Sequence, residues 1–246
     1  MMNNMINIIS SEYQKYKRTF TKKLIYLAPL LTMALCILLG TGAFLQNGTY
    51  NWWYTIILPG VLPLICGEVI KKDKNKVNYR GVLTLPVATK KIWYGKIAVT
   101  ALFYLIASAV LFLGLTLGGL VFGNYIPVPQ SFAGSIVLFL TFLWQIPLCL
   151  FISQHFTMYG AVILNFGCNM AIATFLAKTS LWWVPYAIPA RLMCPIMGVL
   201  PNGLMVEAGS PLLSPDVILP GIIINLTLFT VLSIATARAF NSKGVK

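Results

Sequence analysis

Six long apolar runs divide this chain, and they limit its possible folds more than any other feature. Each run is about 20 residues long, the length of helix that crosses the hydrocarbon core of a bilayer. We place them at residues 24–45, 52–70, 97–122, 133–152, 159–177 and 217–237. The composition agrees, because 58% of the residues are hydrophobic and 9% are charged. The sequence therefore predicts an all-α integral membrane protein with six transmembrane helices, forming one domain over residues 1–246.

Basic residues are unevenly distributed around these runs. Of the 18 Lys and Arg residues, all but Lys178 and Arg191 fall on one side of the predicted spans. By the positive-inside rule, that side is cytoplasmic, and it holds both termini and the connection between spans two and three. Tryptophans near the span ends fit an interfacial belt. Topology and contact with anionic lipid therefore explain the net charge of +13, and no nucleic-acid partner is expected.

Residues that could catalyse a reaction, bind a metal or couple transport to ions are scarce. The five acidic residues fall in tails, loops or span edges: Glu12, Glu68, Asp73, Glu207 and Asp216. No metal-binding trio, no Ser-His-Asp set and no pair of membrane-embedded carboxylates can be assembled from them. The five cysteines lack metal-site or redox spacing, and the chain has no phosphate-binding G-x-x-x-x-G-K-[ST] loop. We expect no catalytic residue, no metal and no cofactor here, so any ATP-driven work requires a separate ATPase.

The single histidine leaves two interpretations open. His155 precedes Tyr159 by one helical turn, which could form a proton relay. A lone histidine at a membrane edge can equally be an interfacial residue without a chemical role.

The connection between spans two and three carries a concentrated positive charge. Within it, Tyr79, Val82 and Leu83 are spaced i, i+3, i+4, which predicts a short helix with one apolar face that ends before Pro86. Such a helix, held at the membrane surface, suits docking to a cytoplasmic motor. The alternative is a basic loop that binds lipid and has no protein partner.

A second surface helix is predicted immediately after Pro86. Thr89 can cap it, with Ile92 and Trp93 facing lipid. In this interpretation, Lys90, Lys91 and Lys96 contact lipid headgroups.

The N-terminal tail has a helical repeat of apolar residues between basic ones. Apolar residues recur at three- and four-residue steps: Ile6, Ile9, Tyr13, Tyr16 and Phe20. We expect an amphipathic helix along the inner leaflet that braces the first span. A simple topology signal is the alternative, although it does not explain the periodic aromatic residues.

The segment before the last span is apolar but rich in proline. Half of the chain's 14 prolines lie here: Pro185, Pro189, Pro195, Pro201, Pro211, Pro215 and Pro220. Proline interrupts regular helix, so we expect short re-entrant helices on the outer side. They could form an outer gate or substrate site, with Trp182, Trp183, Tyr186 and Arg191 as candidate residues, or a structural cap. In span three, the pairs Gly114/Gly118 and Gly119/Gly123 predict close helix packing.

This organisation resembles the type-2 ABC exporter permeases (ABC-2 exporter fold). They combine an N-terminal surface helix, six spans, a coupling helix between spans two and three, and re-entrant helices before span six. The length of 246 residues and a loose loop pattern look like the lantibiotic-protection permeases of the MutE/EpiE kind. That pattern comprises Glu68, Tyr79-Arg80, Leu83, Pro86, Ile92-Trp93 and Lys96.

The resemblance implies a permease subunit of an ATP-driven exporter that expels lantibiotic peptide from the membrane and so gives immunity. Its expected partners are two ATPase copies that bind ATP and Mg, and a second, related permease. Its expected location is the cytoplasmic membrane of a Gram-positive bacterium. Carried onto this chain, the ATPase-coupling residues are Tyr79, Arg80, Val82, Leu83 and Leu85.

Two further points stay open under this resemblance. Glu68 could orient the coupling helix or pair with Lys71 or Lys72. Export of a drug, polyketide or cell-wall precursor is an alternative function, as is a non-transporting assembly or sensor subunit.

Overall fold

The computed structural model describes residues 2–16, 19–40, 43–75 and 88–243, and most of these residues are helical. The helices are α1 (Met2–Gln14), α2 (Phe20–Leu39), α3 (Ala43–Trp52), the π-helix η1 (Trp53–Ile57), α4 (Leu58–Asn75), α6 (Thr89–Phe122), α7 (Val128–Phe142), α8 (Gln145–His155), α9 (Met158–Leu176), α10 (Ile188–Met197), the 3₁₀ turns η2 (Pro211–Leu213) and η3 (Pro215–Val217), and α11 (Ile218–Lys243). No strand occurs in the described ranges, where one isolated bridge joins Val199 to Met205.

Six helical stretches in the described residues are long and apolar enough to cross a membrane, which confirms the predicted number. They are Phe20–Leu39, Leu45–Asp73, Thr89–Phe122, Val128–His155, Met158–Leu176 and Pro215–Phe240. The predicted end of the first span was wrong, because α2 ends at Leu39 and Leu45 belongs to the second span. Gly40 donates the last helical hydrogen bond, to the Cys36 carbonyl, and its own backbone is extended (φ 161°), so the helix does not continue past it.

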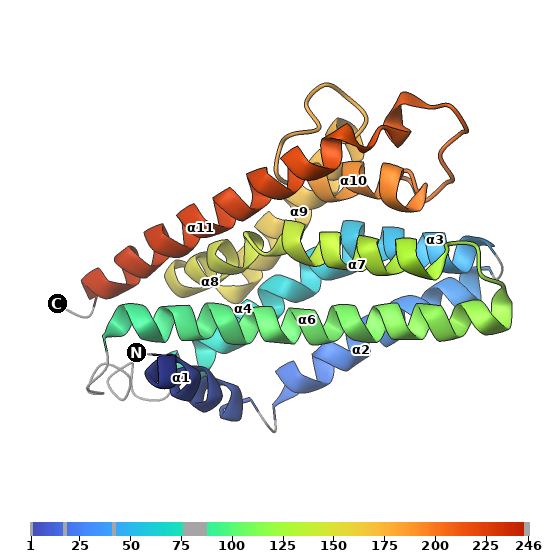
Figure 1. Cartoon of the computed structure of the whole chain (residues 1–246). Helices are drawn as coiled ribbons and strands as arrows, with labels where there is room; N and C mark the ends of the chain where they lie inside the picture. The colour runs from blue at the N-terminus through green and yellow to red at the C-terminus, as the bar shows by residue number, and fades with distance from the viewer. Residues whose placement is uncertain (1, 17–18, 41–42, 76–87, 244–246) are drawn as a thin grey trace.

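The helices form a bundle with two distinct ends (Figure 1). One end, here called the terminal end, holds α1, the last turn of α4, the first turn of α6 and the last turn of α11. The opposite end, here called the α10 end, holds α10 and the loops around it. An even number of spans returns the chain to the side on which it started, so both terminal helices lie at one end.

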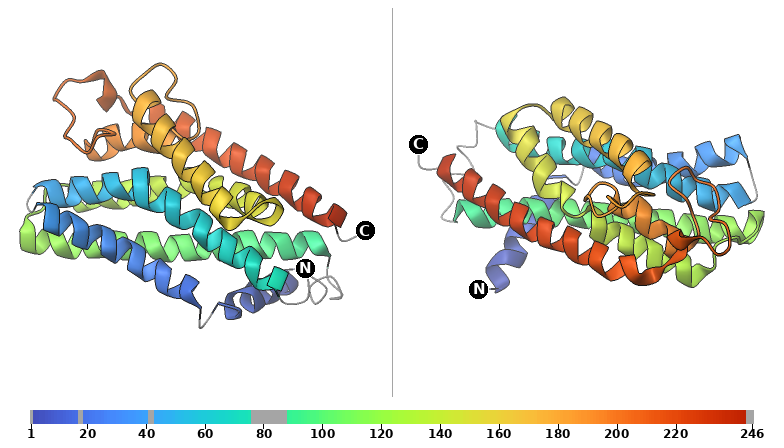
Figure 2. Two further views of the ribbon diagram at one scale, coloured as in Figure 1. Left: turned by 180° about the vertical axis from the view of Figure 1, so that it is seen from behind. Right: turned by 90° about the horizontal axis from the view of Figure 1, so that it is seen from above.

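Helix α1 lies across the start of α6 instead of continuing along a span (Figure 2). The amphipathic N-terminal helix predicted from the sequence is therefore present. We expected this helix to brace the first span, but α1 packs mainly on the third span. Phe20, which we assigned to this helix, begins α2 instead.

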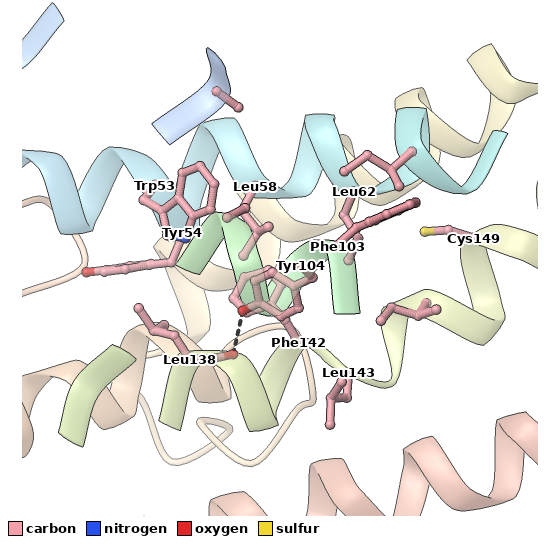
Figure 3. Packing of buried hydrophobic residues seen from close by; sticks show 14 of the residues in the cluster. Trp53, Tyr54, Leu58, Leu62, Phe103, Tyr104, Leu138, Phe142, Leu143 and Cys149 are labelled. Carbon is pink, nitrogen blue, oxygen red and sulfur yellow. Dashed lines mark hydrogen bonds between the residues drawn. The ribbon is translucent and has the colours of Figure 1, made fainter. Parts of the chain in front are cut away.

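Aromatic and aliphatic side chains from three spans meet in the centre of the bundle (Figure 3). Trp53 and Leu62 come from the second span, Phe103 from α6, and Phe142 from α7, and all four are fully buried. The Tyr104 hydroxyl donates a hydrogen bond of 2.8 Å to the Leu138 carbonyl. Inside a membrane, a hydroxyl that finds such a partner avoids a cost of several kcal/mol.

Close packing against the third span confirms the role predicted for Gly114 and Gly119. A Cβ added at Gly114 would lie 2.6 Å from the Met33 thioether of α2. A Cβ at Gly119 would lie 2.7 Å from the Gln46 amide nitrogen of α3. A larger residue at either position would force the Met33 or Gln46 side chain to move.

The proline-rich segment forms short helices, as predicted. Helix α10 ends at Gly198, whose φ of 70° is the left-handed conformation that glycine adopts at no steric cost. The 3₁₀ turns η2 and η3 begin at Pro211 and Pro215. Most residues of α10 are buried against the spans, so α10 forms an integral part of the bundle.

Candidate functional site

Four charged side chains meet inside the terminal end. The Lys15 Nζ lies 2.6 Å from Glu12 Oε1 and 3.0 Å from Asp73 Oδ1. The Lys96 Nζ lies 3.4 Å from Glu12 Oε2 and is also in direct contact with Asp73 Oδ2. Only 0% of Lys96, 3% of Glu12 and 5% of Asp73 is exposed. We call these four residues the ion cluster.

The charges of the ion cluster compensate one another, which makes their burial tolerable. Two carboxylates face two ammonium groups, and each carboxylate contacts both lysines. Removing one partner of a buried ion pair costs about 3–5 kcal/mol, because an uncompensated charge stays behind. Burial lowers the pKa of Lys15, but the contacts with Glu12 and Asp73 outweigh this and hold the pKa above its ordinary value of 10.5. Lys15 therefore stays charged at neutral pH.

Apolar packing and one further hydrogen bond hold the N-terminal segment in place beside the ion cluster. A Cβ at Gly95 would lie 2.7 Å from Ile8 Cγ2, so the absence of a side chain lets α1 approach α6 closely. The Tyr16 hydroxyl donates a hydrogen bond of 3.2 Å to the Val69 carbonyl of α4, and its ring packs edge-on against Phe103. Burial raises the pKa of Tyr16, so its hydroxyl stays protonated and remains a donor.

The ion cluster joins both ends of the connection between spans two and three. Asp73 lies in the last turn of α4, and Lys96 lies near the start of α6. Glu12 and Lys15 connect these two positions to α1 and to the turn that follows it. A displacement of this connection would therefore act on α1, α4 and α6 together.

The predicted ATPase-coupling residues Tyr79, Arg80, Val82, Leu83 and Leu85 lie outside the described residues. Their role stays a prediction. Glu68, which we predicted to support the coupling helix, lies within the described residues. It forms an ion pair of 3.4 Å with Lys71, one of the two partners considered in the sequence analysis. Both side chains are substantially exposed, and such pairs contribute about 0–1 kcal/mol.

The surroundings predicted for three residues at the start of α6 were wrong. Ile92 and Trp93 are buried instead of facing lipid, and Lys96 belongs to the ion cluster instead of contacting headgroups. The reason is that α6 runs without a break from Thr89 to Phe122, so its first turns pack inside the bundle. Thr89 is the first helical residue and not the cap.

Trp93 connects α6 to the last helix. Its indole N–H donates a hydrogen bond of 2.9 Å to Thr236 Oγ1, and its ring stacks on Phe240 with centroids 4.9 Å apart. The start of α6 and the end of α11 are therefore neighbours. Lys90 is exposed at this position, as predicted, and its headgroup contact stays a prediction.

The four residues proposed for an outer gate have different surroundings at the α10 end. Trp183 is 52% exposed, whereas Trp182 is partly buried against the core. The Tyr186 ring packs edge-on against Trp144, with centroids 4.7 Å apart. Arg191 is 6% exposed and donates a hydrogen bond of 2.6 Å to the Leu212 carbonyl. Trp183 is the most accessible of the four, and a gating role for any of them stays a prediction.

Within the described part of the chain, His155 contacts its own helix, and two of the cysteines, Cys66 and Cys149, are neighbours. The His155 ring lies on Phe151 of its own helix, and its Nδ1 is 2.9 Å from the Phe151 carbonyl. The five cysteines are free thiols. No group of three metal-binding side chains occurs among the residues that the structure describes.

Sequence reasoning missed a polar network between α4 and α9. Proline lacks an N–H, so Pro63 leaves the Pro59 carbonyl without its helical donor four residues on. Pro59 follows the π-helix η1, so it leaves the Tyr54 carbonyl without its donor five residues on. The Asn165 amide donates a 3.0 Å hydrogen bond to the Pro59 carbonyl. The Asn169 amide lies 3.1 Å from the Tyr54 carbonyl and 3.2 Å from the Thr55 carbonyl, and donates to both. The spacing gave a usable signal, because both the prolines and the asparagines are four residues apart within apolar runs.

Asn165 extends this network to the α10 end. Its amide also donates 2.9 Å to Gln145 Oε1 of α8, and its Oδ1 accepts a 3.2 Å hydrogen bond from the Tyr186 hydroxyl. Tyr186 is thus attached to a proline-interrupted part of the second span.

The sequence matches a known protein family. Residues 8–171 match the family model described as "ABC-2 family transporter protein", which covers more than half of the chain. The chain belongs to this ABC-2 family. The matched region runs from α1 into α9, so it includes the ion cluster and the proline–asparagine network. Searches of curated proteins and of solved structures gave no match.

Membership in the ABC-2 family defines the general role of the chain. It is a multi-pass membrane permease of an ABC exporter and is not itself catalytic. The family implies association with ABC ATPase partners. In this ABC-2 permease, the ion cluster lies beside the connection for which the sequence predicts ATPase contact.

Proposed function

We propose that this ABC-2 permease exports a lantibiotic peptide from the cytoplasmic membrane of a Gram-positive bacterium and so protects the cell. The substrate class rests on the sequence resemblance to the lantibiotic-protection permeases. The coupling part of the proposal rests on one structural observation: the ion cluster fastens α1, the end of α4 and the start of α6 to one another.

The ion cluster supports coupling because it makes three elements respond to one force. In this proposal, Tyr79, Arg80, Val82, Leu83 and Leu85 contact the ATPase, and both termini are cytoplasmic. ATP and Mg are bound by two copies of that ATPase. When the ATPase moves the connection, Asp73 and Lys96 pass the displacement to spans two and three. A permease pair formed with a second, related subunit would then open toward the exit side.

Exposed apolar side chains at the α10 end support an amphipathic substrate. Leu181, Trp183, Leu204 and Met205 are each about half exposed there. A peptide that leaves the membrane could keep its apolar face in contact with this surface while its polar face reaches water. Export of a drug, polyketide or cell-wall precursor is the alternative, and it would use the same coupling elements.

Cells that express the chain with its ATPase and the second permease test this proposal. They should survive higher lantibiotic concentrations and release cell-bound peptide, intact, into the medium. Both effects should vanish when the ATPase's catalytic glutamate is replaced, because the chain has no evident energy source of its own.

Three outcomes would count against lantibiotic export. Degraded peptide in the medium would indicate a hydrolase, and protection that persists with the inactive ATPase would indicate passive sequestration. Protection against a drug or a cell-wall antibiotic, without any effect on lantibiotic, would favour the alternative substrate.

A further inference from the structure

An apolar groove lies between α6 and α11 near the terminal end. Its volume is about 330 Å³, and its lining includes Tyr94, Ala98 and Ala101 from α6 with Phe229, Ser233 and Ile234 from α11. The small side chains Ala98 and Ala101 leave space between the two helices. From Tyr94 to Ala101 the groove extends about 10 Å along α6, at 1.5 Å per residue.

One polar group in the wall of the groove has no partner. The Ser233 hydroxyl is buried and forms no hydrogen bond with any residue that the structure describes. An unpaired hydroxyl in an apolar wall costs free energy unless a ligand supplies a partner.

Two basic side chains lie beyond the end of the groove that is nearest the terminal end. On α6, Lys90 precedes Tyr94 by four residues, and on α11, Arg238 follows Ile234 by four, so each continues its helix's groove-facing stripe. The contact of Trp93 with Thr236 brings these two helix ends together. Both Lys90 and Arg238 are exposed, and neither forms an ion pair within the described residues.

We propose that this groove binds an anionic phospholipid of the surrounding bilayer. One acyl chain lies between α6 and α11, and the phosphate is held by Lys90 and Arg238. Ser233 lies about 7 Å along α11 from Arg238, a depth at which its hydroxyl can donate to an ester carbonyl below the phosphate. Charge complementarity favours a lipid over a helix of another subunit, because the groove is apolar along its length and positive at its end.

Binding of two lipids to the full-length chain in detergent tests this site. Native mass spectrometry can compare phosphatidylglycerol, which is anionic, with phosphatidylcholine, which carries no net charge. The wild type should bind phosphatidylglycerol more tightly. A Lys90→Gln/Arg238→Gln double variant should lose that preference, with binding weakened about fivefold for each cation removed. These positions are exposed, so the double variant should fold normally.

Two further variants separate the groove from general surface charge. Ala98→Leu fills the groove and should weaken binding of both lipids. Lys23→Gln removes an exposed charge on α2, which lies on the opposite side of α6 from α11, and should change nothing (Figure 1, Figure 2).

Either of two results would overturn the proposal. One is equal binding of phosphatidylglycerol by the wild type and the double variant. The other is unchanged lipid binding by Ala98→Leu together with loss of association with a second permease, which would mean that the groove accepts a helix. Neither result depends on which substrate is exported.

Discussion

Lys15 and Asp73 are 58 residues apart in the sequence, yet the ammonium and the carboxylate lie 3.0 Å from each other. This contact fixes the segment after α1 to the last turn of α4. Through Lys96, the same carboxylate is fixed to the start of α6. The permease thus has an electrostatic brace beside the connection through which we propose that the ATPase acts.

Replacing Lys96 with Met should destabilise the protein by about 3–5 kcal/mol, because Asp73 and Glu12 lose a buried counter-charge. Thermal or denaturant unfolding in detergent measures the change. The Lys96→Met/Asp73→Asn double variant should recover much of the loss, since it removes a charge of each sign. Lys71→Met, which breaks only the exposed pair with Glu68, should cost at most about 1 kcal/mol. Equal losses for Lys71→Met and Lys96→Met would contradict the assignment of the ion cluster.

Asn165→Leu should cost about 1–2 kcal/mol, because the Pro59 carbonyl loses its donor inside the membrane. Asn225→Leu is the matched control, since among the described residues Asn225 donates only to the Gly221 carbonyl of its own helix. The Pro63→Ala background restores a backbone N–H for Pro59, so Asn165→Leu should cost less there. A double-mutant cycle measured by unfolding gives the coupling energy, and a value of zero would show that Asn165 does not compensate for the proline.

The contribution of Lys15 should depend on pH in one direction. Its pKa is higher in the folded state than the ordinary value of 10.5, so its stabilisation is complete below that value and is lost as the pH rises through the folded-state pKa. The difference in unfolding midpoint between wild type and Lys15→Met should therefore be constant near neutral pH and shrink in strongly alkaline buffer. Other lysines titrate in both proteins and cancel in the comparison. A difference that grows with pH would contradict this pairing.

The proposed orientation predicts which positions an impermeant maleimide reaches. A cysteine at Lys76 should react only after cell lysis, whereas a cysteine at Ala208, exposed at the α10 end, should react in intact cells. The parent protein gives the background, because its own thiols are mostly buried. Labelling at position 76 in intact cells would place the predicted coupling segment on the wrong side of the membrane for an ATPase.

Leu83→Asp should abolish co-purification of the ATPase if the predicted apolar face enters a groove on that subunit. A buried, unpaired charge at such an interface costs a few kcal/mol. Thr84→Asp introduces the same charge away from the predicted face of Tyr79, Val82 and Leu83, and should be tolerated. Normal co-purification and ATP turnover with Leu83→Asp would mean that the ATPase binds elsewhere.

Features that depend on a local stretch of chain could be predicted from the sequence. Hydropathy over about 20 residues identified six spans, because the cost of placing a segment in lipid is nearly additive along that segment. The prolines after residue 184 predicted the short helices around α10, and Gly114 and Gly119 predicted close packing on α6. Each of these is a property of the residue and its immediate neighbours.

Other features depend on which face each helix turns toward its neighbours, and these could be seen only in the tertiary structure. Span helices are apolar on all sides, so hydrophobicity did not indicate that Trp93 faces α11 instead of lipid. Glu12, Asp73 and Lys96 looked like separate charges at span edges, and only the packing of α1 across α6 makes them one cluster. A buried charge needs a partner from wherever the fold can supply one, and here that partner lies far away in the sequence.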